Sequence, residues 1–80
     1  MRGDLDLIAS RDDLVVVCEV KTRRAGSPGG AVSAVTPAKQ EQIRLLTAVW
    51  LSEFPQPDVR VRFDVIAIDG VRVVHWDDAF

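Results

Sequence analysis

The chain has 80 residues, of which 48% are hydrophobic and 28% charged, and its net charge is −2. This length supports one small core, which excludes a multidomain protein and makes residues 1–80 a single domain. The apolar content excludes a disordered tail. A single cysteine excludes a disulfide framework and a zinc site built on several cysteines, and no apolar run approaches a membrane span. We therefore expect a soluble cytoplasmic protein without a membrane partner.

The N-terminal part of the sequence predicts two strands. Residues 4–9 alternate polar and apolar side chains, which is typical of a short strand. Residues 14–20 are almost continuously apolar and rich in valine, which favours a strand that is buried on both faces. Residues 10–13 are polar and form the connecting turn.

The register of this hairpin follows if residues 12 and 13 are the two turn residues. Asp6 then lies opposite Glu19, and Asp4 lies opposite Lys21. One face of the hairpin carries these four charged side chains together, and a three-residue turn would shift the register by one. The opposite face then carries the apolar residues Leu5, Leu7, Cys18 and Val20.

A glycine-rich loop and a long helix follow. Residues 22–35 include three glycines behind a basic run, and a loop of this length is usually functional or mobile. Thr36 and Pro37 are a good helix start, and the helix is expected to run from Pro37 to about Phe54, before two prolines. Its predicted apolar face is Ile43, Leu46, Val49, Trp50 and Phe54.

The C-terminal part predicts a second hairpin, with strands at 59–68 and 71–76 around an Asp69-Gly70 turn. In that register Asp64 lies opposite His75, which favours a structural pair. The predicted fold is α/β or α+β: a mixed four-stranded sheet with one long helix on one face, in the order β-β-α-β-β.

Glu19 is the most informative charged residue because it interrupts an otherwise apolar strand. A buried charge needs a partner or a metal ion. Carboxylates are suitable ligands for Mg²⁺ or Mn²⁺, and two acids beside Lys21 are the parts needed for phosphodiester hydrolysis. The simpler interpretation is an exposed charged patch at a strand end, and for an arbitrary sheet it is the commoner one.

The basic residues are concentrated in one stretch, since residues 20–44 hold five basic side chains and one acid. This pattern fits contacts with a nucleic-acid backbone, and a solvated loop is the alternative. The glycines do not have the spacing of a nucleotide-binding motif. Candidates for backbone contacts are Arg23, Arg24, Lys39 and Arg44.

Three motifs in order resemble a known family: residues 3–9 (GDLDLIA), 18–23 (CEVKTR) and 36–40 (TPAKQ). They are similar to the YraN family, an uncharacterised bacterial family of predicted endonucleases that is related to archaeal Holliday junction resolvases and the PD-(D/E)xK nuclease superfamily. The closing stretches, 62–65 and 75–80, are similar too, so the resemblance covers essentially the whole chain.

The resemblance implies a restriction-endonuclease-like core and a role for each matching residue. Asp6 and Glu19 would bind the metal, with the Val20 carbonyl as a further ligand, and Lys21 would be the catalytic lysine. Gln40, on the first turn of the helix, would reach toward the site, although an exposed glutamine is an equal alternative.

The sequence departs from the family pattern at its start, where members carry an additional helix. We expect this N-terminal helix to be missing. One helix covers only one face of the sheet, so we also expect self-association or a partner that caps the other face.

Three hypotheses follow. The first is a Mg²⁺- or Mn²⁺-dependent endonuclease acting on DNA, with branched DNA among its candidate substrates. The second is a non-catalytic nucleic-acid-binding module with the same fold, and the third is a structural fragment that lost its activity with the first helix.

Overall fold

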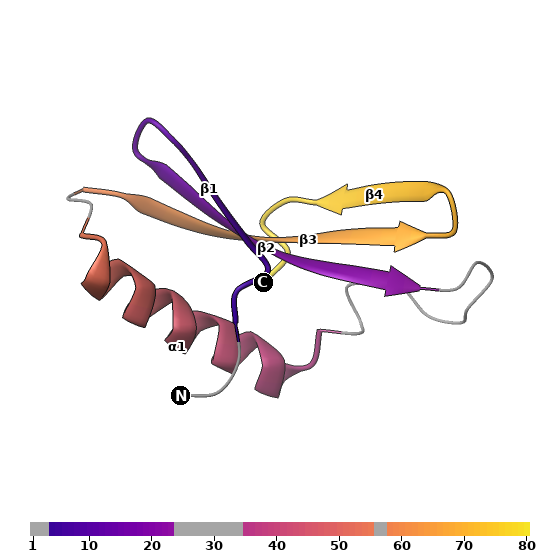
Figure 1. Ribbon diagram of the computed structural model, residues 1–80, viewed down its shortest axis with the longest axis horizontal. Coiled ribbons are helices and arrows are strands. Elements are labelled where there is room, and N and C mark those ends of the chain that lie inside the picture. The colour runs from indigo at the N-terminus through magenta and orange to yellow at the C-terminus, as the bar shows by residue number, and fades with distance from the viewer. Residues whose placement is uncertain (1–3, 24–34, 56–57) are drawn as a thin grey trace.

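The computed structural model describes residues 4–23, 35–55 and 58–80, which form a four-stranded sheet and one helix. The sheet order is β1-β2-β3-β4; β2 and β3 are parallel, and the two outer pairs are antiparallel (Figure 1). The predicted mixed sheet and element order are confirmed. The elements are β1 (Leu7–Arg11), β2 (Leu14–Arg23), α1 (Pro37–Glu53), β3 (Arg60–Asp69) and β4 (Arg72–Trp76).

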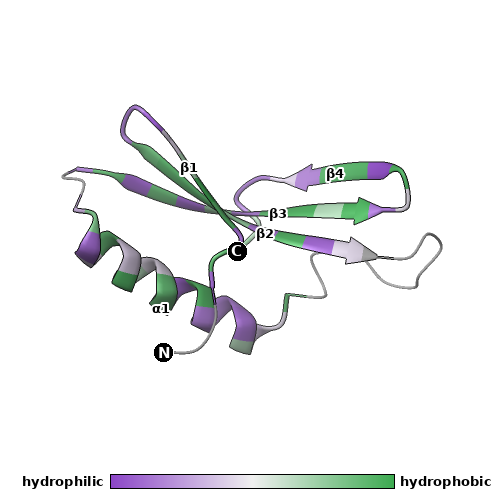
Figure 2. Ribbon diagram, in the orientation of Figure 1, coloured by the Kyte–Doolittle hydropathy of each residue, from purple (hydrophilic) through white to green (hydrophobic). Residues whose placement is uncertain are grey.

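The core lies between α1 and one face of the sheet (Figure 1). β2 and β3 run side by side in parallel at the centre of the sheet, and Figure 2 shows green, hydrophobic segments in both strands. The parallel register brings alternate residues of the two strands to the same face. The buried core residues are Val15, Val17, Val35, Ile43, Val65 and Ala67.

The helix begins and ends close to its predicted limits. The Thr36 hydroxyl caps its start by accepting from the Lys39 amide at 3.2 Å, and the Phe54 amide closes its end. The predicted apolar face is partly wrong, because Ile43 and Thr47 are the buried residues, whereas Val49 and Phe54 are exposed. Thr47 is tolerated there because its hydroxyl donates to the Ile43 carbonyl at 2.7 Å. No helix of the described residues has the length and apolar character needed to cross a membrane.

The first hairpin has the predicted register, in which Leu7 pairs with Cys18 and Arg11 with Leu14. However, β1 begins at Leu7 and not at residue 4. The Val20 amide donates to the Asp6 carboxylate at 3.0 Å, so a side chain takes the place of further strand pairing. Since the chain leaves the sheet at this point, Leu5 packs against the core on the α1 side, and its predicted position on the other face is wrong.

The second hairpin has a register that differs from the prediction. Asp69 pairs with Arg72, so the two turn residues are Gly70 and Val71. Gly70 has a φ of 61°, as expected when glycine is the first central residue of a two-residue turn. His75 therefore lies opposite Ile66, two residues beyond the predicted partner.

The sheet face away from α1 carries no further element of the described chain (Figure 1). Cys18 and Asp64 are buried on this face, and Leu7 and Val73 are 47% and 66% exposed. The expectation that a second copy or another segment covers it stays a prediction.

Candidate functional site

The candidate site is centred on Glu19, which is only 6% exposed although it carries a carboxylate. Its position on β2 is opposite Val65 of β3, on the face that α1 covers. Two lysines approach the same oxygen, Glu19 Oε1. The Lys21 ammonium nitrogen lies 3.5 Å away, and that of Lys39, from the first turn of α1, lies 3.9 Å away. The buried charge is thus partnered, as the sequence required.

Asp6 contributes a second negative charge to this site. The Val20 amide fixes its carboxylate just before β1 begins. Burial raises the pKa of Glu19, and the charge of Asp6 raises it further, while Lys39 and Lys21 act in the opposite direction. A cation bound near Glu19 would relieve the repulsion that Asp6 exerts on the ionised Glu19 carboxylate.

Asp6, Glu19 and the Val20 carbonyl offer oxygen donors, which are the ligands that hard divalent ions prefer. Among residues 4–23, 35–55 and 58–80, no cluster of three or more His, Cys, Asp or Glu side chains is suited to hold a metal. Asp6 and Glu19 would therefore act as a pair, with the Val20 carbonyl as a further oxygen. Mg²⁺ commonly binds through one or two carboxylates, and waters and substrate phosphates complete its shell.

The other predicted site residues lie in different surroundings. Gln40 is on the first turn of α1, but its amide nitrogen donates to the Val35 carbonyl at 3.0 Å. Arg44 lies over the rings of Phe63 and Phe80, with its guanidinium carbon 5.0 Å and 5.3 Å from their centroids.

Two of the predicted DNA contacts, Arg23 and Arg24, come from the end of β2 and the segment that follows it. Arg24 lies outside the described residues, as does most of the 22–35 loop, and Arg23 ends β2 at the boundary of the described segment. Of the four predicted basic contacts, the structure places Lys39 beside Glu19.

A second buried carboxylate, Asp64, was predicted only as a partner of His75. It is fully buried on the face away from α1 and accepts both guanidinium hydrogen bonds of Arg62 at 2.8 Å. His75 Nε2 lies 2.7 Å away, and the Asp78 amide donates at 2.9 Å. The predicted pair therefore exists, but it is diagonal, because a register shift of two keeps both residues on one face.

The contacts of Asp64 decide its charge state. Burial alone would raise its pKa, but the hydrogen bonds from Arg62, Asp78 and His75 outweigh burial and lower the pKa to about 2. Asp64 is thus an anchor that holds the C-terminal residues against β3. The sequence signal for this network was Asp64, a charged residue within an apolar strand and two residues after Arg62. Glu19 is signalled in the same way, as a charge that interrupts an apolar strand.

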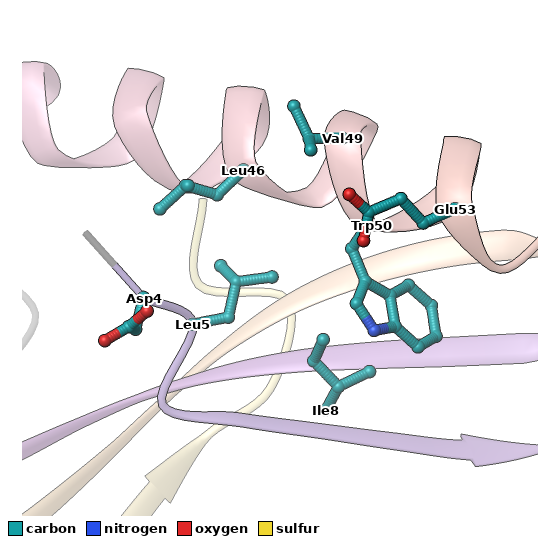
Figure 3. A pocket seen from close by; sticks show the side chains of 7 residues that line it. All are labelled: Asp4, Leu5, Ile8, Leu46, Val49, Trp50 and Glu53. Atoms are coloured by element: carbon teal, nitrogen blue, oxygen red, sulfur yellow. The ribbon is translucent and has the colours of Figure 1, made fainter. Parts of the chain in front are cut away.

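A cavity of about 490 Å³ lies between the N-terminal segment, β1 and α1 (Figure 3). Leu5 and Ile8 face Leu46 and Trp50 across it, and Asp4 and Glu53 lie along its rim. No lysine or arginine lines this cavity, and neither Asp6 nor Glu19 contributes to it. Asp4 precedes β1 and lines this cavity, so it is not paired opposite Lys21 as the sequence predicted.

Comparison with known proteins identifies relatives of the chain. The family model described as "Uncharacterised protein family UPF0102" matches residues 1–68. The chain belongs to the family UPF0102. The matched part includes Asp6, Glu19, Lys21 and Lys39, and thus all of the candidate site.

Individual UPF0102 proteins align over most of the chain. A UPF0102 protein of Kineococcus radiotolerans is 49% identical over 67 residues, which cover 82% of this chain and 55% of that protein. One of Rhodococcus opacus is 52% identical, and one of Parafrankia is 40% identical, each over 83 residues that cover 98% of this chain and 70% of the relative. The names of these UPF0102 relatives state no activity, so function is argued from the site.

Proposed function

We propose that the chain carries the centre of a divalent-metal-dependent endonuclease that hydrolyses phosphodiester bonds of DNA. The observation that carries this proposal is Glu19, a buried carboxylate with two lysines within 4 Å and the Asp6 carboxylate beside it. The resemblance to predicted endonucleases in the Asp6 and Glu19 motifs supports the same conclusion.

Asp6 and Glu19 would hold Mg²⁺ or Mn²⁺, with the Val20 carbonyl beside them. When bound, such an ion polarises a phosphate and lowers the pKa of a coordinated water. Asp6 is held in place by the Val20 amide, and Glu19 by its position within β2. Both carboxylates are therefore fixed before a metal arrives, which limits the conformational cost of binding.

Lys21 follows Glu19 by two residues, so both side chains lie on the same face of β2. Its ammonium group would orient the attacking water or contact the scissile phosphate. Lys39 would hold the DNA backbone beside Glu19, because phosphate contacts come mostly from such groups. Arg23, Arg24 and Arg44 are the further candidates that the sequence gives for backbone contacts. Duplex, branched and single-stranded DNA are all candidate substrates.

Cleavage of labelled DNA tests this proposal. We expect Mn²⁺-dependent cleavage of at least one of three substrates: duplex, single strand or four-way junction. Glu19→Gln should abolish it, whereas Glu41→Gln, which changes an exposed glutamate on α1, should not. A longer protein with the additional sequence of the relatives belongs in the same assay, since they are longer than this chain. Cleavage that survives Glu19→Gln, or no cleavage by either length, would contradict the proposal.

A DNA-binding module without catalysis is the second candidate. It is favoured by the fact that Lys21 and Lys39 already neutralise Glu19 and by the lack of a third clustered ligand among the described residues. This alternative predicts DNA binding that weakens with salt and does not change on addition of metal. Binding that survives Lys21→Ala would favour it further.

A further inference from the structure

Two lysines from different elements converge on one buried carboxylate oxygen. Lys21 comes from β2 and Lys39 from the start of α1, which are separated by the 24–34 segment in the sequence. Both lysine side chains are about 30% exposed, whereas that of Glu19 is 7% exposed. The lysines therefore border the site on its solvent side and are accessible to a ligand that approaches Glu19.

On the first turn of α1, Lys39 contacts Glu19, whereas the neighbouring Gln40 contacts the backbone. Gln40 is engaged with the Val35 carbonyl, so its amide nitrogen is directed to the backbone. The Lys39 backbone is fixed by the Thr36 cap, and its side chain extends to Glu19. Lys39 is thus the residue of this turn that belongs to the charged centre.

The charges of the centre explain why a second lysine is useful. Asp6 and Glu19 carry two negative charges, and Lys21 and Lys39 carry two positive charges, so the centre is neutral without a metal. A divalent ion on the two carboxylates makes it doubly positive. A water that has lost its proton to the solvent would attack the phosphodiester monoanion, forming one P–O bond as the P–O bond to the leaving oxygen breaks, and the leaving oxygen would take a proton from the solvent. The transition state carries two negative charges, which this centre matches. Without Lys39 the centre would match only the single charge of the substrate.

We propose that Lys39 is a second catalytic lysine, which leaves Glu19 when a divalent ion binds there and then contacts the non-bridging oxygens of the scissile phosphate. This inference rests on the proposed nuclease function and assigns Lys39 a place at the reacting phosphate, beyond a general contact with the DNA backbone. In the metal-free protein the Lys39 ammonium nitrogen lies 3.9 Å from Glu19 Oε1, so its positive charge competes with a metal ion for this carboxylate.

The test uses Lys39→Met, which keeps the aliphatic stem, with Lys39→Arg as the charge-preserving variant and Glu41→Gln, at an exposed position on α1, as the control. The first measurement is Mn²⁺ affinity by calorimetry. Lys39→Met should bind Mn²⁺ several-fold more tightly, because a competing positive charge close to Glu19 is gone. Lys39→Arg and Glu41→Gln should bind Mn²⁺ as the wild type does.

The second measurement separates kcat from KM for DNA cleavage. Lys39→Met should lower kcat about a hundredfold, as loss of one transition-state contact does, while KM changes far less. Lys39→Arg should recover most of the rate. Circular dichroism spectra establish that each variant is folded.

The outcomes distinguish this inference from the nuclease proposal. If the wild type binds Mn²⁺ and cleaves DNA but Lys39→Met has wild-type affinity and kcat, only the role of Lys39 is refuted. A rise in KM alone would also refute it, because it would reduce Lys39 to a backbone contact. If the wild type neither binds Mn²⁺ nor cleaves DNA, the nuclease proposal fails, and this inference fails with it.

Discussion

The Asp64 network makes a quantitative prediction about stability. The pKa of Asp64 falls from its ordinary value of 3.8 to about 2 on folding. Since a tenfold change in proton affinity corresponds to about 1.4 kcal/mol, the ionised carboxylate contributes about 2 kcal/mol to the free energy of unfolding at neutral pH. Asp64→Asn removes this contribution and should lower the stability by about that amount.

The pH dependence has a defined sign. The pKa is lower in the folded state, so the contribution is complete above the unfolded value near 4 and is lost as the pH falls toward the folded value of about 2. About half of it should be gone by pH 3. Urea unfolding followed by the fluorescence of Trp50 and Trp76, at pH 7, 5, 4 and 3, measures this difference between the wild type and Asp64→Asn.

The matched control is Asp13→Asn, which removes an ion pair between Asp13 and Arg60 that is 3.4 Å long and solvent-exposed. Such an exposed ion pair contributes little to the free energy of unfolding, so Asp13→Asn should have nearly the wild-type stability at every pH. The reasoning would be refuted if Asp64→Asn were no less stable than Asp13→Asn at pH 7. It would also be refuted if the deficit of Asp64→Asn were the same at pH 3 as at pH 7.

Two further predictions concern single side chains. The Cys18 thiol should react slowly with a disulfide reagent in the native protein and rapidly in urea. The reason is that the thiol is buried, and burial together with the charge of Asp64 raises its pKa. Fast labelling of the native protein would contradict the buried position of Cys18. Thr36→Ala should lower the free energy of unfolding, measured in urea, by about 1 kcal/mol, since the Lys39 amide loses its acceptor. Ser52→Ala, near the other end of α1, should lower it by less. Equal losses of stability would refute the capping argument.

The two hairpins show how far turn residues determine register. At the first, residues 12 and 13 are the turn, and the predicted pairing was correct. At the second, an Asp-Gly pair is compatible with two placements, and the structure uses Gly70 as the first turn residue and not the second. Asp69 stays in β3 opposite Arg72, so local preference alone could not fix the register.

The candidate site was predictable where a charge interrupts an apolar strand. Glu19 and its neighbour Lys21 are found by this rule because a strand places them on one face. Asp6 was placed near Glu19 by the hairpin register. The approach of Lys39 was not predictable, since it depends on how α1 is placed over the sheet, which no local pattern encodes. The same applies to Arg44, whose contacts with Phe63 and Phe80 arise only in the folded chain.

The central claim is that Asp6 and Glu19 form a divalent-metal site, and a Mn²⁺ titration followed by electron paramagnetic resonance tests it most directly. We predict saturable binding that is at least about tenfold weaker in Asp6→Asn and in Glu19→Gln, because each variant removes one of two charged ligands. Glu41→Gln should bind as the wild type does. Absence of a Mn²⁺ site, or the same affinity in all four proteins, would contradict the claim.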